Sequence, residues 1–310
     1  MRGKNIIVAG GAGFIGSNLV DRLANDNKVF VIDNMHTGSM DNLKDAMKTG
    51  NVTFIKDDIK NIANHNIEAD YIFHLGMYSS TPMYRENPSL VGEVVHGMIG
   101  TLEYAKKAGA PVVFASTSSL YNGVKPPHNE DVNLPVTDYY TEAKVAAERI
   151  SKLYVDLHGL NVAGMRFFSV YGYHEKSKGK YANLATQFLL AMKKAERPVI
   201  YGDGLQKRDF VFVSDVVDAM IRAAEHNKGF NAYNVGRGEN YNLNELVEKI
   251  NTALGTGIKP EYVSIPIKNY VMETLADTTK SEKMLGFKAQ THIDKGIELL
   301  NNYYDGEQHR

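Results

Sequence analysis

"IIVAGGAGFIGSNLVDRL", Ile6 to Leu23, decides the fold. Its first four residues form an apolar run rich in β-branched side chains, which predicts a buried strand. The apolar residues from Phe14 onward recur at helical spacing, and glycines occupy positions 10, 13 and 16 between the two segments. Glycine permits a tight turn and a close approach of the backbone to a ligand. The stretch therefore predicts a strand, a turn and a helix in immediate succession.

The same alternation continues through the first half of the chain. Further strands are predicted at residues 28–33, 52–56, 69–76, 110–117 and 161–168, and helices at 14–26, 87–109 and 139–159. Strands that alternate with helices predict a Rossmann-type, doubly wound parallel sheet of the α/β class. Beyond Tyr171 the alternation weakens, and we predict a smaller C-terminal α/β lobe that lies over the mouth of the sheet. The domains are predicted at 1–171 and 172–310, with a return to the first near 208–235.

The glycine turn points to a dinucleotide. The amino end of a helix favours the negative charge of a pyrophosphate, and glycines let the phosphates come close. Asp33 stands 20 residues after Gly13, at the end of the second predicted strand. A carboxylate there binds both ribose hydroxyls and repels a 2′-phosphate, which favours NAD over NADP. A plain glycine-rich turn is the alternative. Asp58 is placed either to contact the adenine or to cap a helix.

Tyr140 and Lys144 lie four residues apart in "DYYTEAKVAAER" and so share one face of a predicted helix. Tyrosine is a poor base at neutral pH because its ordinary pKa is about 10. A neighbouring ammonium and the positive nicotinamide ring both favour the phenolate. The pair is therefore suited to accept a proton from an alcohol during its oxidation. By itself the spacing is common on surface helices.

Composition excludes several function classes. The 310 residues carry a net charge of −1, which gives no electrostatic reason to expect nucleic acid. We expect no membrane association, because no run reaches the roughly 18 apolar residues of a membrane span. Without cysteine there is no disulfide, thiolate catalysis or zinc–cysteine site. The histidines do not cluster with carboxylates at metal-binding spacing, and His74 is predicted to be a satisfied residue at a strand end. A cytoplasmic location is compatible with these features.

Eight motifs, in order, resemble the extended short-chain dehydrogenase/reductases, in particular their nucleotide-sugar epimerases. They are "GGAGFIG", "HLGM", "STSSLYN", "YYTEAK", "RFFSVYG", "YGDGLQKRDFVFVSDV", "YNVG" and "LADTTK". The resemblance implies an NAD-binding domain, a lobe for a sugar nucleotide and the catalytic set Thr117, Tyr140 and Lys144. The cofactor-binding residues it indicates are Gly10, Gly13, Phe14, Ile15, Gly16, Asp33, Asn34, Asp58, Ile59, Leu75, Gly76, Met77, Tyr140 and Lys144. The substrate-binding residues it indicates are Ser79, Thr117, Ser118, Phe167, Ser169, Asn183, Tyr201, Arg208 and Lys268.

Positions 118 and 119 separate the reactions of this family. Dehydratases carry an acid and a base there ("STDEVYG"), and decarboxylases carry one glutamate ("STSEVYG"). Here both residues are serines, which cannot act as carboxylate acids or bases. The 3,5-epimerases typically use a cysteine, and this chain has none. We therefore predict 4-epimerisation of a UDP-hexose. The alternatives are another epimerase or oxidoreductase of the family, such as a UDP-uronate epimerase, and a non-catalytic NAD-binding regulator.

The resemblance also has departures. The family usually has an asparagine at the strand end where this chain has Ser169. The asparagine of the family's Asn-x-x-Gly-Thr motif is Gly97 here. A late arginine of the family is absent, and Lys268 is the basic residue nearby. Arg208 is predicted to bind the diphosphate, with an ion pair to Asp203 or Asp209 as the alternative. Residues 78–81 are expected to line the reacting sugar. Tyr84 and Arg85 are expected in a solvated loop, although they could reach a substrate carboxylate. Apolar faces on 88–107 and 140–157 predict a homodimer built on a four-helix contact.

Overall fold

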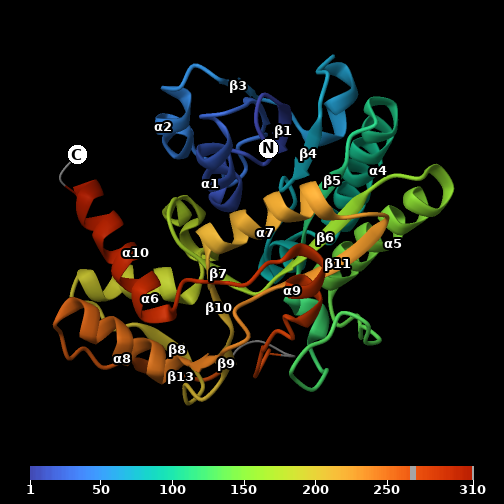
Figure 1. The fold of residues 1–310 in the computed structure, drawn as a ribbon. Coiled ribbons are helices and arrows are strands. Elements are labelled where there is room, and N and C mark those ends of the chain that lie inside the picture. The colour runs from blue at the N-terminus through green and yellow to red at the C-terminus, as the bar shows by residue number, and fades with distance from the viewer. Residues whose placement is uncertain (266–269, 309–310) are drawn as a thin grey trace.

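A parallel sheet of seven strands forms the centre of the computed structural model, which describes residues 1–265 and 270–308 (Figure 1). Its strand order is β11-β6-β5-β4-β1-β2-β3, and every neighbouring pair is parallel. The predicted α/β fold with a doubly wound parallel sheet is confirmed. The strands are β1 (Asn5–Ala9), β2 (Lys28–Ile32), β3 (Val52–Ile55), β4 (Tyr71–His74), β5 (Val112–Thr117), β6 (Val162–Phe167) and β11 (Phe230–Val235).

The order of these strands creates a crevice. The chain runs outward from β1 to β3 and then crosses to β4 on the other side of β1. The loops that follow β1 and β4 therefore diverge at the carboxyl ends of adjacent strands, where ligands bind in open α/β sheets. Gly10 and Gly76, which begin the two divergent paths, approach each other at this point.

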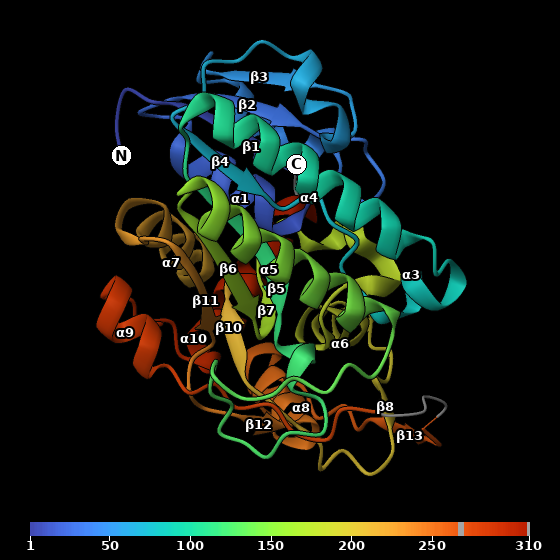
Figure 2. The ribbon, with the colours of Figure 1, turned by 90° about the vertical axis from the view of Figure 1, so that its right-hand side faces the viewer.

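Helices cover both faces of the sheet. On one face α1 (Phe14–Leu23) packs against α7 (Val213–His226), and the short α2 (Lys44–Met47) contacts α1. Figure 2 looks onto the other face, where α4 (Leu90–Ala108) lies beside α5 (Tyr139–His158). Separate apolar clusters fill the space beneath each layer, and the buried strand residues alternate between them: Ile6 and Val8 face one cluster, and Ile7 and Ala9 the other. A strand buried on both faces explains the uninterrupted apolar run in the sequence.

The second half of the chain builds a lobe at the carboxyl end of the sheet (Figures 1 and 2). A third apolar cluster, which includes Phe188, Phe210, Leu246 and Leu300, forms its core. Its helices are α6 (Leu184–Lys193), α8 (Leu243–Leu254) and α10 (Ile293–Gln308). Its strands pair as β7 (Ser169–Tyr171) with β10 (Phe210–Phe212), β8 (Val199–Tyr201) with β13 (Glu261–Val263), and β9 (Lys207–Arg208) with β12 (Tyr241–Asn242).

The two halves are interleaved. Strand β11 leaves the lobe to pair with β6 at the edge of the central sheet, and α9 (Thr279–Leu285) packs against α7 and β11. The division at 171/172 stays a prediction. The remaining elements are α3 (Thr81–Glu86) and four 3₁₀ helices: η1 (Met40–Leu43), η2 (Ile59–Asn64), η3 (Ser118–Tyr121) and η4 (Glu175–Tyr181).

Candidate active site

Two adjoining pockets open at the carboxyl ends of the strands. The smaller, of about 80 Å³, lies over β1, β2 and β4, and the larger, of about 520 Å³, extends between the sheet and the lobe. Both are lined by residues of the turns after β1 and β4, so they form one continuous site. The shared lining residues are Gly10, Gly13, Thr37, Leu75, Met77 and Ser79.

The glycine turn is packed so closely against backbone that it has no room for side chains at two of its glycines. Gly10 has a φ of +72°, and a Cβ there would lie 2.5 Å from the backbone nitrogen of Gly76. At Gly16 a Cβ would lie 2.1 Å from the carbonyl oxygen of Gly10. Helix α1 begins after Gly13 with no side chain capping its first N–H groups. Phe14, Ile15 and Gly16 line the larger pocket, so this helix start is available to bind a phosphate group.

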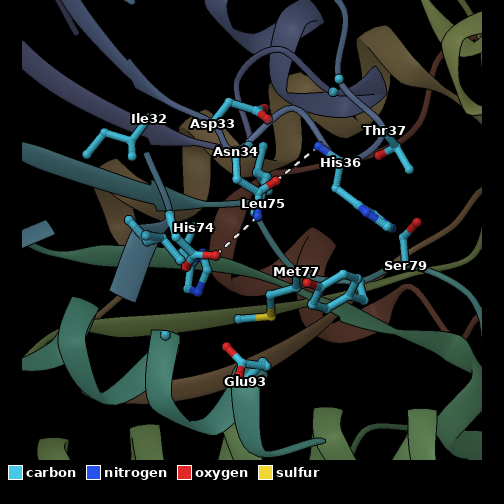
Figure 3. A pocket seen from close by; sticks show the side chains of 18 of the residues that line it. Ile32, Asp33, Asn34, His36, Thr37, His74, Leu75, Met77, Ser79 and Glu93 are labelled. Carbon is cyan, nitrogen blue, oxygen red and sulfur yellow. Dashed lines mark hydrogen bonds between the residues drawn. The ribbon is translucent and has the colours of Figure 1, made fainter. Parts of the chain in front are cut away.

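Asp33 and Asn34 follow β2 at the wall of the smaller pocket (Figure 3). The Asp33 carboxylate accepts hydrogen bonds from the backbone N–H of Ala12 at 2.9 Å and of Met35 at 2.8 Å. These bonds hold the carboxylate next to the glycine turn, and burial raises its pKa. The side chain of Asn34 donates to Asp58 at 3.1 Å. A carboxylate held next to a glycine turn in this way suits the hydroxyls of an adenosine ribose.

Asp58 forms the predicted helix cap and also lies at the wall of the smaller pocket, while its contact with an adenine remains a prediction. Its Oδ1 accepts from the backbone N–H of Lys60 and caps η2, while the residue also lines the smaller pocket. All the predicted cofactor-binding residues line one or both pockets: Ile59, Leu75, Gly76 and Met77 belong to the smaller one, and Tyr140 and Lys144 to the larger. Their role in cofactor binding remains a prediction that this arrangement supports.

The predicted catalytic set converges in the larger pocket from two elements. Thr117 ends β5, and Tyr140 and Lys144 lie in the first turns of α5. Asp138 starts that helix through a reciprocal capping box with Thr141, which sets where its first turn begins. The side chain of Thr117 hydrogen-bonds to Tyr140, and the Lys144 ammonium lies 5.8 Å from the centre of the Tyr140 ring.

The electrostatics differ from the sequence-based expectation. Burial raises the pKa of Tyr140 to about 12, although the hydrogen bond to Thr117 lowers it. Burial also lowers the pKa of Lys144 to about 7. Desolvation disfavours the charged form of each group, and this effect exceeds the mutual stabilisation that the spacing predicted. A phenolate at position 140 therefore needs more positive charge than Lys144 alone provides.

Most predicted substrate residues lie around the larger pocket, and one of those within the described ranges, Tyr201, does not. Ser79, Ser118, Phe167, Ser169, Asn183 and Arg208 line it together with Thr117. Tyr201 lies on β8 with 38% of its surface exposed, outside the lining of both pockets. Lys268 falls outside the described residues. Asn183 also caps α6 by accepting from the backbone N–H of Ala185, so one side chain has a structural role at the pocket wall.

Arg208 does not form the alternative ion pair that its neighbours suggested. Its guanidinium donates to the carbonyl oxygens of Lys207 at 2.8 Å and of Val271 at 2.5 Å. The Asp209 carboxylate is occupied by the backbone N–H groups of Arg237, at 2.7 Å, and of nearby residues. Arg208 is thus held in place by the backbone, with its positive charge uncompensated by either aspartate.

Two expectations for neighbouring residues are wrong. Tyr84 is buried in α3 rather than placed in a solvated loop, because its ring packs beside Tyr140 at 5.3 Å. Ser116, near the end of β5, donates to Glu148 at 2.7 Å. His74 is buried, yet neither ring nitrogen has a partner among the described residues.

Other pocket residues carried no signal in the sequence. Lys178 and Tyr181 come from η4, and Tyr270 and Thr274 from the segment before α9. The folding of the lobe brings them to the larger pocket from distant parts of the chain. No local sequence pattern predicts such long-range contacts. In the smaller pocket, His36 lies beside Tyr78 with ring centres 5.0 Å apart.

Comparison with known proteins places this site in a family. The family model described as "NAD dependent epimerase/dehydratase family" matches residues 6–236. The chain belongs to this family. It is 32% identical to a UDP-glucose 4-epimerase of Mycolicibacterium smegmatis, over 96% of this chain and 97% of the relative. It is 30% identical to UDP-glucuronic acid decarboxylase 5 of Arabidopsis thaliana, over 95% and 87%.

A solved structure gives the same assignment for the fold. The UDP-N-acetylglucosamine 4-epimerase of Methanobrevibacter ruminantium, in complex with UDP-N-acetylmuramic acid, superposes with a TM-score of 0.92. It is 30% identical to this chain and is covered completely by it, while 99% of this chain is matched. The predicted resemblance to the nucleotide-sugar epimerases and the predicted cofactor NAD are both confirmed.

The donor set fits NAD. The open helix start after Gly13 suits the pyrophosphate, Asp33 the adenosine ribose, and Lys144 with Tyr140 the nicotinamide end. Among residues 1–265 and 270–308, no cluster of His, Asp and Glu could hold a metal ion. No helix within those ranges is long and apolar enough to cross a membrane.

Proposed function

We propose that this protein is an NAD-dependent nucleotide-sugar 4-epimerase that acts on a UDP-hexose through a transient 4-keto sugar. The observation that carries the proposal is the pair of serines that follows Thr117. Ser118 and Ser119 line the larger pocket from η3, directly beside the catalytic hydroxyls. A family member that eliminates water or carbon dioxide from the keto sugar needs a carboxylate acid or base near this place.

The carboxylates that do line the larger pocket are occupied. Among its described lining residues they are Asp138 and Glu175. Asp138 accepts from the backbone N–H of Thr141 at 2.8 Å and from the Thr81 hydroxyl at 3.2 Å. Glu175 is buried and accepts from the backbone N–H of Asn183 at 2.7 Å. Both side chains maintain local structure, which leaves reversible oxidation as the chemistry that the pocket supports best.

The residues of the chain divide this reaction between them. Bound NAD supplies a hydride acceptor and a positive charge close to Tyr140. The Tyr140 phenolate takes the proton of the sugar 4-hydroxyl as the C4–H bond breaks and the carbonyl forms, with Thr117 holding that oxygen. Once the ketone has turned its other face, the same proton returns from Tyr140 to the oxygen as the C–H bond is remade. No electrons, protons or atoms are lost over the cycle.

A UDP-uronate epimerase is the second candidate, and Arg85 favours it. This arginine lies in the last turn of α3 rather than in the expected loop, and it lines the larger pocket together with Ser80 and Thr81. A guanidinium at that wall suits a sugar carboxylate. The solved relative from Methanobrevibacter ruminantium, bound to UDP-N-acetylmuramic acid, adds acidic sugar nucleotides to the substrates worth testing.

The decisive experiment incubates the purified protein with UDP-glucose, UDP-N-acetylglucosamine and UDP-glucuronic acid in separate reactions, each followed by NMR. We expect inversion at C4 without net formation of NADH for one of them. Stoichiometric NADH with an oxidised sugar would contradict the proposal in favour of a dehydrogenase. Release of carbon dioxide or water would indicate a decarboxylase or dehydratase, and NAD binding without any turnover would indicate a regulator.

We also infer a homodimer formed through α4 and α5. Ile99 on α4 and Leu153 and Leu157 on α5 are exposed, and Leu157 keeps 72% of its surface accessible. Neighbouring helices that expose apolar side chains are well suited to pack against a second copy. Light scattering should give twice the monomer mass, and Leu153→Asp with Leu157→Asp should give the monomer. A cytoplasmic location remains our prediction.

A further inference from the structure

A buried ion pair lies one helical turn from the catalytic lysine. Arg166 on β6 donates to both carboxylate oxygens of Glu148 on α5, from Nε at 3.0 Å and from a terminal nitrogen at 2.7 Å. The Glu148 and Arg166 side chains expose only 8% and 5% of their surfaces. A bidentate pair of this kind has a defined geometry as well as charge. Neither residue lines the site pockets, so substrate and cofactor contacts do not explain it.

Glu148 connects the two elements that carry the catalytic groups, α5 and β5. Glu148 follows Lys144 by four residues and shares its face of α5. Its Oε1 also accepts from the hydroxyl of Ser116, the residue immediately before Thr117 on β5. One carboxylate therefore connects the strand that presents the catalytic threonine to the helix that presents the tyrosine and the lysine.

We propose that Glu148 is a positioning residue that favours the ammonium form of Lys144 and sets α5 against the end of β5. This inference rests on the proposed function in one respect, namely that Lys144 takes part in the reaction. Glu148 is the carboxylate beside the Lys144 ammonium on α5. The positive charge of Arg166 partly neutralises the Glu148 carboxylate and so weakens its effect on Lys144.

The charges around Lys144 support this role. On its own helix it is flanked by Tyr140 and Glu148, while β4 contributes His74 and β6 contributes Arg166. Burial lowers the pKa of Lys144, and the negative charge of Glu148 opposes that shift. His74 is held neutral because burial and the nearby Lys144 charge lower its pKa to about 3. Tyr140 is also neutral at pH 7 in the protein alone.

Arg166 is itself held on its other side, so it does not move freely. It donates to the Tyr121 hydroxyl at 2.8 Å and to the backbone carbonyl of Glu130 at 3.0 Å. Tyr121 in turn donates to Asn234 on β11 at 2.7 Å. The pair is thus part of a polar network that runs from α5 to the far edge of the sheet, and its geometry is set by the whole fold.

The test measures the titration of Lys144 directly. The protein is labelled with ¹³C at the lysine ε carbon, and the resonance absent from Lys144→Met is followed with pH. Glu148→Gln keeps the shape but removes the negative charge, and we expect the pKa of Lys144 to fall by about one unit. Arg166→Met leaves the Glu148 charge uncompensated, and we expect that pKa to rise. Opposite shifts are not expected from a general loosening of the fold.

Two controls complete the design. Glu130→Gln alters a residue that binds Arg166 through its backbone carbonyl, and Arg166→Lys preserves the charge, so neither should move the titration by more than about 0.3 unit. If Glu148→Gln does not fold, the direction in which Arg166→Met shifts the Lys144 pKa decides the test. Because the measurement needs no substrate, it remains informative if the 4-epimerase proposal fails. An unchanged Lys144 pKa in a folded Glu148→Gln protein, or shifts of the same sign in both variants, would overturn the inference.

Turnover gives an independent readout. Since the ammonium form of Lys144 is required, kcat should decline above the pKa of Lys144, and Glu148→Gln should move that decline to lower pH. KM for the sugar nucleotide should stay unchanged, because Glu148 does not line the substrate pocket. A fall in kcat that is equal at every pH would show a structural role without the proposed effect on Lys144.

Discussion

The ammonium nitrogen of Lys144 lies 3.3 Å from the sulfur of Met77 and 3.0 Å from the carbonyl oxygen of Ala115. A thioether is a weak acceptor, so one of the two protein partners of this ammonium stabilises its charge poorly. Met77 also covers Lys144 from the side of β4, and both side chains are almost fully buried. The contact helps to explain why Lys144 loses its proton so readily.

Substitution of Met77 should change the Lys144 pKa in a direction that depends on the replacement. Met77→Leu conserves volume but removes the acceptor, and the pKa of Lys144 should fall below its present value of about 7. Met77→Ala opens space for water, so the pKa should rise. The ¹³C titration described above measures both. Equal values in all three proteins would show that the sulfur contact has no electrostatic effect.

Lys144 should lower stability at neutral pH. Its pKa of about 7 in the folded protein lies below the ordinary 10.5. The unfolded chain therefore binds more protons than the folded one between about pH 7 and pH 10.5, and stability from this group increases as the pH rises through that window. Lys144→Met, which is uncharged, should raise the melting temperature at pH 7 and lose that advantage near pH 10. A destabilised variant at pH 7 would contradict the assigned direction.

Removal of the Tyr140 hydroxyl should separate binding from chemistry. Tyr140→Phe keeps the ring that packs against Tyr84 and removes the proton acceptor. We expect turnover to fall by about 10²–10⁴-fold, with NAD and UDP-sugar affinity retained. Calorimetry and NMR-detected epimerisation measure the two properties. Phe in place of exposed Tyr139, the preceding residue, is the matched control and should leave turnover intact.

Asp33 should determine the choice of nicotinamide cofactor. Asp33→Ser shortens the side chain and removes the charge that repels a 2′-phosphate. NAD affinity should fall and NADP affinity should rise relative to it, as measured by fluorescence of the reduced forms. Asp26→Ser, a change at an exposed aspartate before β2, serves as the control. Unaltered discrimination in a folded Asp33→Ser protein would exclude this role.

Arg208 should contribute to sugar-nucleotide affinity. Arg208→Lys keeps a positive charge but loses the planar guanidinium that suits a diphosphate. We expect KM for the UDP-sugar to rise about tenfold, with a much smaller change in kcat. Arg197, which binds the carbonyl oxygens of Lys259 and Pro260 away from both pockets, provides the control as Arg197→Lys. An unchanged KM would show that the diphosphate is held elsewhere.

The first half of the fold and much of the candidate site follow from local sequence. The uninterrupted apolar run at 6–9 indicates burial on two faces of a strand, and the helical spacing from Phe14 indicates burial on one face of a helix. Each pattern is complete within a short stretch of the sequence. The glycines at 10 and 16 are needed because a Cβ at either position would meet backbone atoms at 2.5 and 2.1 Å. The spacing of Tyr140 and Lys144 predicts a shared helix face without any knowledge of the neighbouring strands.

The tertiary structure decided what lies around those residues. Contacts between distant segments determine four features of the structure. They are the placement of β11, the position of Tyr270 in the pocket lining, the position of Tyr201 outside it, and the Glu148–Arg166 pair. So do the pKa values of Tyr140 and Lys144, because desolvation is a property of the assembled surroundings and not of a residue type. Sequence by itself determined which chemical groups this protein has and along which helix or strand they lie. The folded structure determined how far each group is shielded from solvent and which charged groups lie near it.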